Sequence, residues 1–201
     1  RLDLLVVRAT ELAEGVTWTE AAVGQALLPG GTHTHFGTHN KLLGLDDLYL
    51  EVIAIDPAAQ DLQYTRWYDL DAFGGPTALG QWAVATDNLN TALEILGPAY
   101  GTPIDLARGD LRWRMAVPSN GQLPFDTIAP AIIEWQSDVL PPARLPVSGL
   151  SLETLTISHP KAEVLAAQLE PYLNDARIVF QVDSAIKLSA SLMGEGRRWH
   201  I

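Results

Sequence analysis

Two glutamates lie at positions where a strand would not normally carry one. Glu51 and Glu134 each sit in a short apolar stretch with the composition of a β-strand. Glutamate is depleted in strands and is almost never buried without a partner. Because side chains alternate along a strand, Glu51 should share a face with Tyr49, and Glu134 should share one with Ile132. Both carboxylates are therefore candidates for proton transfer or for binding a cation.

Two carboxylates that face each other inside an apolar cup cannot both stay charged unless a cation lies between them. A divalent metal ion is the simplest such cation, and the Gln81 amide would add a third oxygen ligand. Three oxygens without an imidazole favour manganese or magnesium over zinc, with water completing the shell. Two other arrangements stay open: one carboxyl group is protonated, or one pairs with Arg112 or Arg114 on the neighbouring strand.

Three segments of the chain begin alike, and they must position these residues. Each starts with a short apolar strand that leads through a polar cap residue into a helix. The strands are expected at 2–7, 79–84 and 152–157, and the helices at about 11–24, 88–97 and 160–173. Thr10 or Asp87 would cap its helix, and Pro160 fits a first helical turn.

Strands, rather than a second helix, follow each of these helices. They are expected at 32–36, 38–45 and 48–55, then at 102–107, 110–117 and 129–136, and finally at 176–182 and 185–192. The order βαβββ, βαβββ, βαββ occupies units 1–56, 78–137 and 151–201, joined by connections at 56–77 and 137–150. Strands with helices on one face define an α+β fold. Because one unit alone leaves a sheet edge and one face exposed, the first two should pair into a single curved cup.

The repeat predicts that four positions point at one place in the cup. Gln81 follows Leu4 by 77 residues (81 − 4), and Glu134 follows Glu51 by 83 (134 − 51). Loops can absorb the difference of six residues. The first strands then contribute Leu4 and Gln81, and the last strands contribute the two glutamates. Leu4 offers no ligand, which favours an interpretation without a metal.

Composition excludes several classes of protein. The chain has 201 residues, with 13 Lys and Arg against 24 Asp and Glu, and a net charge of −11. This acidic balance disfavours nucleic-acid binding, because phosphate backbones are repelled. Without cysteine there are no disulfides, thiolate zinc sites or thiol nucleophiles. No apolar run approaches the roughly 20 residues that cross a bilayer, and the first residues lack the pattern of a signal peptide. We therefore expect a cytoplasmic protein without a membrane partner.

The order and spacing of several short motifs resemble a known family. The motifs are Leu2-Asp3-Leu4-Leu5-Val6, Gly30-Gly31-Thr32-His33, Gly37-Thr38-His39-Asn40, Tyr49-Leu50-Glu51 and Leu111-Arg112-Trp113-Arg114-Met115-Ala116-Val117-Pro118. Through them the chain is similar to the vicinal-oxygen-chelate superfamily, and more narrowly to its glyoxalase-like domain proteins, from Leu2 to about Leu192.

The resemblance implies a glyoxalase/bleomycin-resistance-like cup of paired βαβββ modules. In metal-dependent members, each module's first strand gives one ligand and each last strand gives a glutamate. Carried over, these positions are Leu4, Glu51, Gln81 and Glu134. The metal would be manganese, zinc, nickel, iron or magnesium. Leu4 stands where similar chains usually have histidine, and Gln81 is an acceptable variant.

Other polar residues could contact a substrate. His39 and Asn40, which open a strand, could point at the mouth of the cup or hold the preceding loop. His33 and His35, with His39, form a weaker candidate metal site. Arg112 and Arg114 share a strand face and could clamp a substrate carboxylate, although pairing with Asp105 or Asp110 is favoured over that role.

Two functions are compatible with these residues. The first is a metal-dependent lyase or isomerase of a small carbonyl or hydroxy-acid metabolite, in which the ion stabilises an enediolate-like charge. In it, Glu51 and Glu134 are metal ligands, and either could act as general base. The alternative is a metal-free protein that binds or sequesters a small molecule on the same scaffold. The third unit would cover a sheet edge, and formation of a homodimer stays open.

Overall fold

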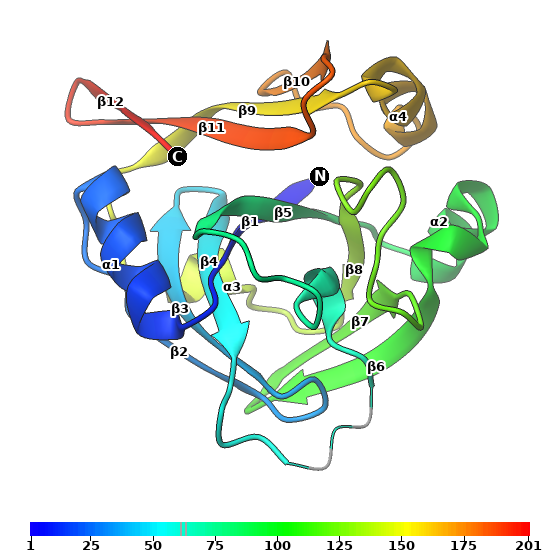
Figure 1. Ribbon diagram of the computed structural model, residues 1–201, viewed down its shortest axis with the longest axis horizontal. Helices are drawn as coiled ribbons and strands as arrows, with labels where there is room; N and C mark the ends of the chain where they lie inside the picture. Colours follow the sequence, from blue (N-terminus) through cyan, green and yellow to red (C-terminus); the bar gives the residue numbers. More distant parts are fainter. Residues whose placement is uncertain (61, 63) are drawn as a thin grey trace.

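The computed structural model describes residues 1–60, 62 and 64–201 (Figure 1). The first module comprises β1 (Leu2–Arg8), α1 (Leu12–Val23), β2 (Leu28–His33), β3 (Thr38–Leu45) and β4 (Leu48–Ile55). The second comprises β5 (Ala78–Ala85), α2 (Leu89–Leu96), β6 (Thr102–Arg108), β7 (Leu111–Val117) and β8 (Ala131–Trp135). The third comprises β9 (Ser151–His159), α4 (Ala162–Leu169), β10 (Ile178–Val182), β11 (Lys187–Gly194) and β12 (Arg197–His200). Shorter turns are η1 (Trp67–Asp69), η2 (Pro98–Tyr100) and α3 (Pro141–Arg144).

The first two modules form one eight-stranded sheet, which confirms the expected α+β cup. Its strand order is β2-β3-β4-β1-β5-β8-β7-β6. At the centre, β1 and β5 run antiparallel, and each lies parallel to the last strand of its own module. The sheet curls into a half-barrel with α1 and α2 on its outside (Figure 1). Strand β4 is buried along residues 48–54, which explains its nearly continuous apolar sequence.

The third unit forms a separate four-stranded sheet with the order β10-β9-β11-β12. It packs on the convex side of the half-barrel, where Phe180 lies against Trp82 with ring centroids 6.5 Å apart (Figure 1). Gln168 donates a hydrogen bond to the Leu96 carbonyl at 3.0 Å, and the Arg177 guanidinium binds Asp47 at 2.7 and 2.8 Å. The unit therefore contacts both modules. It covers a sheet face rather than a sheet edge, which corrects the expectation from the sequence.

Strand β12 was not expected from the sequence. It pairs antiparallel with β11 through a tight turn at Glu195 and Gly196, whose φ angles are 48° and 70°. Two consecutive left-handed residues are the requirement of a type I′ hairpin turn. The strand brings Trp199 against α1, where a Cβ at Gly24 would collide with the indole.

The helix boundaries follow local capping. The left-handed Gly24 (φ 67°) ends α1 as expected. Asn88, rather than Asp87, caps α2, because its side chain accepts a hydrogen bond from the Thr91 amide at 3.0 Å. Helix α4 begins at Ala162, two residues after Pro160. Within the described residues, no helix is long and apolar enough to span a membrane.

Candidate functional site

A cavity of about 30 Å³ lies inside the cup, between the two modules. Its wall is formed by Leu4, His33, Tyr49, Glu51, Trp67, Tyr68, Arg108, Trp113, Met115, Ile133 and Trp135. These residues come from β1, β2, β4, β6, β7, β8 and η1. Among the described residues of this wall, Glu51 is the one carboxylate, so the chemistry of the cavity centres on it.

Glu51 is buried on β4, with 6% of its surface exposed. Its Oε2 atom accepts a hydrogen bond of 2.5 Å from the Asn40 side-chain amide on β3. Strand pairing sets this contact, because Leu42 lies opposite Glu51 and Asn40 is two residues along on the same face. Burial raises the pKa of Glu51, and the Asn40 hydrogen bond and the Arg108 charge only partly offset this.

The Gly30-Gly31 motif fixes the Asn40 side chain. Asn40 Oδ1 accepts a hydrogen bond of 2.8 Å from the Gly31 amide. A Cβ at Gly30 would collide with the same oxygen. The Asn40 amide is thus oriented with its NH₂ group toward Glu51, and glycine is required where the backbone of β2 approaches it.

His33 is the second titratable group in the wall. Its Nδ1 atom lies 3.0 Å from Thr38 Oγ1, and its Nε2 atom lies 3.2 Å from a terminal nitrogen of Arg108. Because a guanidinium only donates, Nε2 accepts, and the proton of the neutral ring is assigned to Nδ1. Burial and the Arg108 charge lower the pKa of His33 to about 3.

Arg108 enters the cavity from the end of β6, across from Glu51 and His33. The same terminal nitrogen lies 3.4 Å from Asn40 Oδ1. A Cβ at Gly31 would lie 2.8 Å from Arg108 Cδ, so this glycine makes room for the side chain. Arg108 was not among the residues expected from the sequence. The Gly30-Gly31 pair indicated it in the sequence, because two residues without side chains leave room for a side chain from another strand.

Aromatic side chains close the rest of the cavity. Trp67 stacks on Phe36 with ring centroids 4.2 Å apart, and Trp113 lies 5.7 Å from Trp135. Tyr68 has a left-handed φ of 58°, which is uncommon for a bulky residue. Its backbone carbonyl accepts a hydrogen bond of 3.0 Å from Arg8. Trp67 and Tyr68 come from the connection 56–77, of which residues 61 and 63 lie outside the described part.

Glu134 does not join Glu51, contrary to the expectation from the sequence. Its neighbours Ile133 and Trp135 line the cavity, so alternation directs Glu134 to the opposite face of β8. There its Oε2 atom accepts from the Leu89 amide at 2.7 Å and lies 3.4 Å from Arg114. A carboxylate at this place favours the start of α2, where backbone amides have no helical partner.

The register of the strands explains why the repeat misplaced this residue. On β4, Glu51 pairs with Val6 of β1. The residue of β5 that follows Val6 by the same 77 positions is Ala83, which pairs with Ala131 of β8. Ala131 and, two residues along on the same face, Ile133 thus correspond to the face of Glu51, whereas Glu134 lies on the other face. A shift of one residue moves every side chain to the other face of a sheet. Loops can absorb extra residues, but loop length does not decide which face of a strand a side chain occupies.

Gln81 and Leu4 complete the set of four expected positions. Gln81 is fully buried, but its NH₂ group donates to the Thr127 carbonyl at 2.5 Å and its Oε1 accepts from the Trp82 amide at 2.8 Å. It is not part of the cavity wall, whereas Leu4 lines the cavity with an apolar side chain. The structure therefore brings together Leu4 and Glu51, and leaves Gln81 and Glu134 outside.

Residues 2–173 match the family described as the glyoxalase-like domain. The chain belongs to this family. The glyoxalase-like protein is 13% identical to a hypothetical protein from Staphylococcus aureus, with a TM-score of 0.60 over 99% of this chain and 83% of that chain. A Streptomyces coelicolor methylmalonyl-CoA epimerase is 12% identical, with a TM-score of 0.44 over 69% of this chain and 98% of that chain. For the Mycobacterium tuberculosis epimerase the values are 16%, 0.43, 67% and 85%. No curated protein matches the chain.

The divalent metal implied by the superfamily does not fit this donor set. Leu4 has no ligand atom, the Gln81 amide is bound within the chain, and Glu134 faces away. Nowhere in the described ranges do three His, Asp or Glu side chains converge as metal ligands. The cavity instead contains the positively charged Arg108, which would repel a cation.

The remaining predicted residues lie outside the cavity wall. Asn40 lies behind the wall, where it contacts Glu51, and His39, one residue earlier, points to the other face of β3. Arg114 pairs with Asp105 at 3.3 Å, which confirms the favoured pairing, and Asp110 pairs with Arg144 instead. Arg112 donates to the Gly109 and Leu111 carbonyls at 2.7 and 2.8 Å and so holds its hairpin turn.

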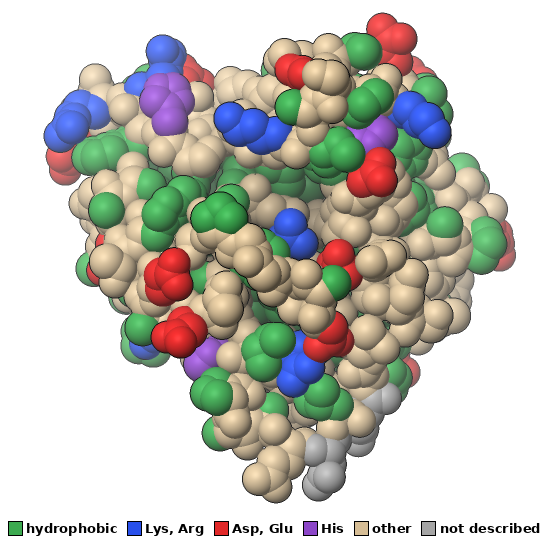
Figure 2. All heavy atoms as spheres, viewed as in Figure 1, with side chains coloured by type: hydrophobic (Ala, Val, Ile, Leu, Met, Phe, Trp, Pro, Cys, Tyr) green, Lys and Arg blue, Asp and Glu red, His purple; other side chains and the backbone are tan. Residues whose placement is uncertain are grey.

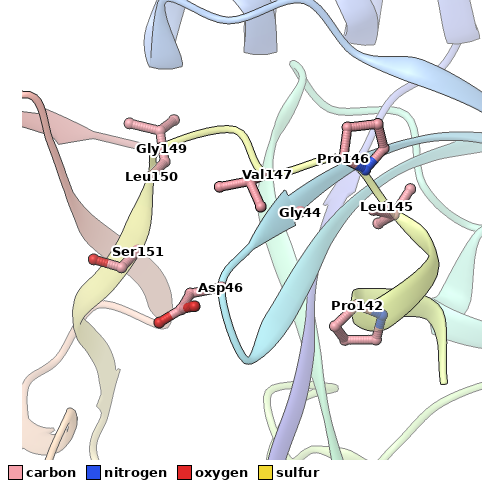
Figure 3. A pocket seen from close by; sticks show the side chains of 9 residues that line it. All are labelled: Gly44, Asp46, Pro142, Leu145, Pro146, Val147, Gly149, Leu150 and Ser151. Atoms are coloured by element: carbon pink, nitrogen blue, oxygen red, sulfur yellow. The ribbon is translucent and has the colours of Figure 1, made fainter. Parts of the chain in front are cut away.

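Two other features of the surface offer less chemistry. Acidic and basic side chains are interspersed on the face in Figure 2, which is hollowed below the C-terminal sheet. A pocket of about 290 Å³ lies between the β3–β4 turn and the segment 142–151 (Figure 3). Its lining is apolar or backbone apart from Ser151 and the Asp46 carboxylate. The described lining contains no His, Lys or Arg, and Asp46 is exposed, so Glu51 is the better candidate for catalysis.

Proposed function

We propose that this protein is a small-molecule lyase or isomerase in which Glu51 transfers a proton of a small carbonyl or hydroxy-acid metabolite. The observation that carries the proposal is the environment of Glu51, which is the single carboxylate among the described residues of an otherwise aromatic, apolar and cationic cavity wall. A base in such a site is held in place by Asn40 and is shielded from water.

Glu51 would act as a general acid–base catalyst. Burial raises the pKa of its carboxyl group, and a base works best when its pKa approaches the working pH. Glu51 would accept a proton from the carbon next to a carbonyl group and return it to the same or a neighbouring atom. The charge that develops on the substrate oxygen would be stabilised by the N–H and O–H groups around the cavity.

Substrate entry requires the aromatic wall to move. A cavity of about 30 Å³ has room for water-sized molecules only. Trp67 and Tyr68 belong to the connection 56–77 rather than to the sheet, so their movement would leave the hydrogen bonds of the sheet intact. Their return over the substrate would exclude water from the reacting atoms.

Exchange of carbon-bound hydrogen in deuterium oxide tests the proposal. The protein is incubated with pyruvate, lactate, hydroxyacetone and glyceraldehyde, and deuterium incorporation is followed by proton NMR. We expect Glu51→Gln to lose at least about 100-fold in exchange rate, in the range typical of a general base. Glu134→Gln is the matched control and should keep the wild-type rate. Equal rates for Glu51→Gln and wild type would refute the role of Glu51.

A second candidate function is binding without turnover, and the small size and aromatic wall of the cavity favour it. A protein that only sequesters its ligand needs enclosure and no base. In that case the same compounds would shift the tryptophan fluorescence of the wild type without any hydrogen exchange. Glu51→Gln would then alter affinity alone.

A further inference from the structure

We propose that Arg108 supplies the positive charge of this cup and binds the ligand through a carboxylate or similar planar monoanion, without a metal ion. This inference rests on the proposed function only in placing the ligand in the same cavity. It adds the chemical class of the ligand and the residue that recognises it.

The first step is the unpaired charge of Arg108. Its guanidinium lies in the wall of a largely apolar cavity, yet in the described part of the chain no carboxylate lies within 4.0 Å of it. One terminal nitrogen contacts His33 and Asn40. Nε and the other terminal nitrogen make no hydrogen bond to the residues described. A guanidinium with a free edge matches the two oxygens of a carboxylate.

The second step is independent of Arg108 and concerns the other polar groups of the wall. Trp67 Nε1 is buried and has no acceptor among the described residues. Burial raises the pKa of Tyr49 and of Tyr68 well above the usual range of a phenol, so both hydroxyls keep their protons. For neither hydroxyl is a hydrogen bond found in the described residues. The described residues of the wall thus carry several donors against one carboxylate acceptor, and their complement is a ligand rich in acceptors.

The third step limits the charge and the size of the ligand. Glu51 shares the cavity with Arg108. The two negative charges of a dianion and the charge of Glu51 would then be balanced by the Arg108 guanidinium alone. A monoanion leaves the smaller excess of negative charge. The closeness of the aromatic walls restricts the ligand to a few non-hydrogen atoms beyond its carboxylate.

Binding of simple carboxylates to metal-free protein tests the inference. Formate, acetate, pyruvate and lactate are titrated in EDTA at constant ionic strength, with tryptophan fluorescence and the NMR signal of the Arg108 Nε–H as readouts. Chloride and the uncharged hydroxyacetone are the reference ligands. We expect the carboxylates to bind and to shift the Arg108 signal, and chloride and hydroxyacetone to bind at least about tenfold more weakly, as expected for a charge-assisted pair.

Variants assign the effect to this side chain. Arg108→Gln should weaken carboxylate binding at least about tenfold, and Arg108→Lys should restore part of it, because lysine keeps the charge but loses the bidentate fork. Arg144→Gln removes an arginine on α3 and should bind like the wild type. Circular dichroism and thermal unfolding establish that each variant is folded. If Arg108→Gln does not fold, the NMR shift in the wild type decides.

Three results would overturn the inference: no response to any of the four carboxylates, equal binding of hydroxyacetone, or binding that requires added Mn²⁺. Its failure is distinguishable from that of the proposed function. Carboxylate binding without hydrogen exchange would contradict the proposed enzyme activity and support the Arg108 site. Exchange that depends on Glu51 but not on Arg108 would do the reverse.

Discussion

At the scale of single residues, the polar chemistry of the cup is arranged around His33 and Asn40. Each makes at least two hydrogen bonds that fix its orientation, and together they join Thr38, Arg108 and Glu51. A buried polar network of this kind is costly unless its members are satisfied. His33 meets this condition only as a neutral ring, since a protonated ring would place a second positive charge beside Arg108.

This neutrality predicts how stability depends on pH. The native pKa of His33 is about 3, whereas an unfolded histidine titrates near its ordinary value of 6.5. Between these values the unfolded chain binds the extra proton, so the contribution of His33 is complete above that ordinary value and is lost as the pH falls. From about pH 7 to about pH 5 the loss is about 2 kcal/mol.

Urea unfolding at these two pH values measures the effect. The loss of unfolding free energy should be about 2 kcal/mol smaller in His33→Gln than in the wild type. His200→Gln, at an exposed position on β12, should behave as the wild type. An unchanged pH dependence in His33→Gln would contradict the assignment of a buried, neutral ring.

At the scale of elements, the start of α2 shows how one helix uses residues from two places. Asn88 caps it locally, and Glu134 reaches it from β8. The free amides of a first helical turn need such acceptors. Glu134 thus has a structural role, which accounts for a glutamate at this position in a strand.

Replacement of Asn88 and of Asp87 shows which of the two residues caps α2. Asn88→Ala should lower the free energy of unfolding by about 1 kcal/mol, because the Thr91 amide loses its acceptor. Asp87→Ala, one residue earlier, should change it by less than about 0.5 kcal/mol. Chemical denaturation of both variants is the measurement. A larger loss in Asp87→Ala would return the cap to the residue that the sequence favoured.

At the scale of the whole molecule, the C-terminal sheet binds the two modules to each other from the convex side. Phe180 lies against Trp82, which is fully buried at the centre of the half-barrel. Contacts of Arg177 with Asp47 and of Gln168 with Leu96 add one anchor on each module. The sheet and the cup should therefore unfold together.

Phe180→Ala tests this coupling. It should lower the free energy of unfolding by about 2 kcal/mol, less than the full cost of a core Phe→Ala change because the ring is only partly buried. Val179→Ala, on the exposed face of the same strand, should cost less than about 0.5 kcal/mol. Calorimetry should show one transition in all three proteins. Two transitions, with only the first affected by Phe180→Ala, would show that the sheet folds independently.

The sequence by itself determined the modules, the cup and the choice of Glu51 as a candidate. Helices and hairpins are encoded locally, through apolar periodicity, Gly24 and turns such as Asp46-Asp47, so their positions could be inferred from neighbouring residues. Glu51 stood out for a local reason too, since a glutamate in an apolar strand needs an explanation. Strand β12 was missed although its Glu195-Gly196 turn is also local.

Only the tertiary structure decided which side chains share the cavity. Sheet register determines whether Ile133 or Glu134 faces Glu51, and register depends on strand pairing between residues about 50 positions apart in the chain. Arg108 reaches the site because the two ends of a curled sheet approach each other, and a strand pattern does not encode that curvature. The face of the strand on which a side chain lies can thus be inferred from its sequence neighbours. Its contacts across the cup depend on the curvature of the whole sheet.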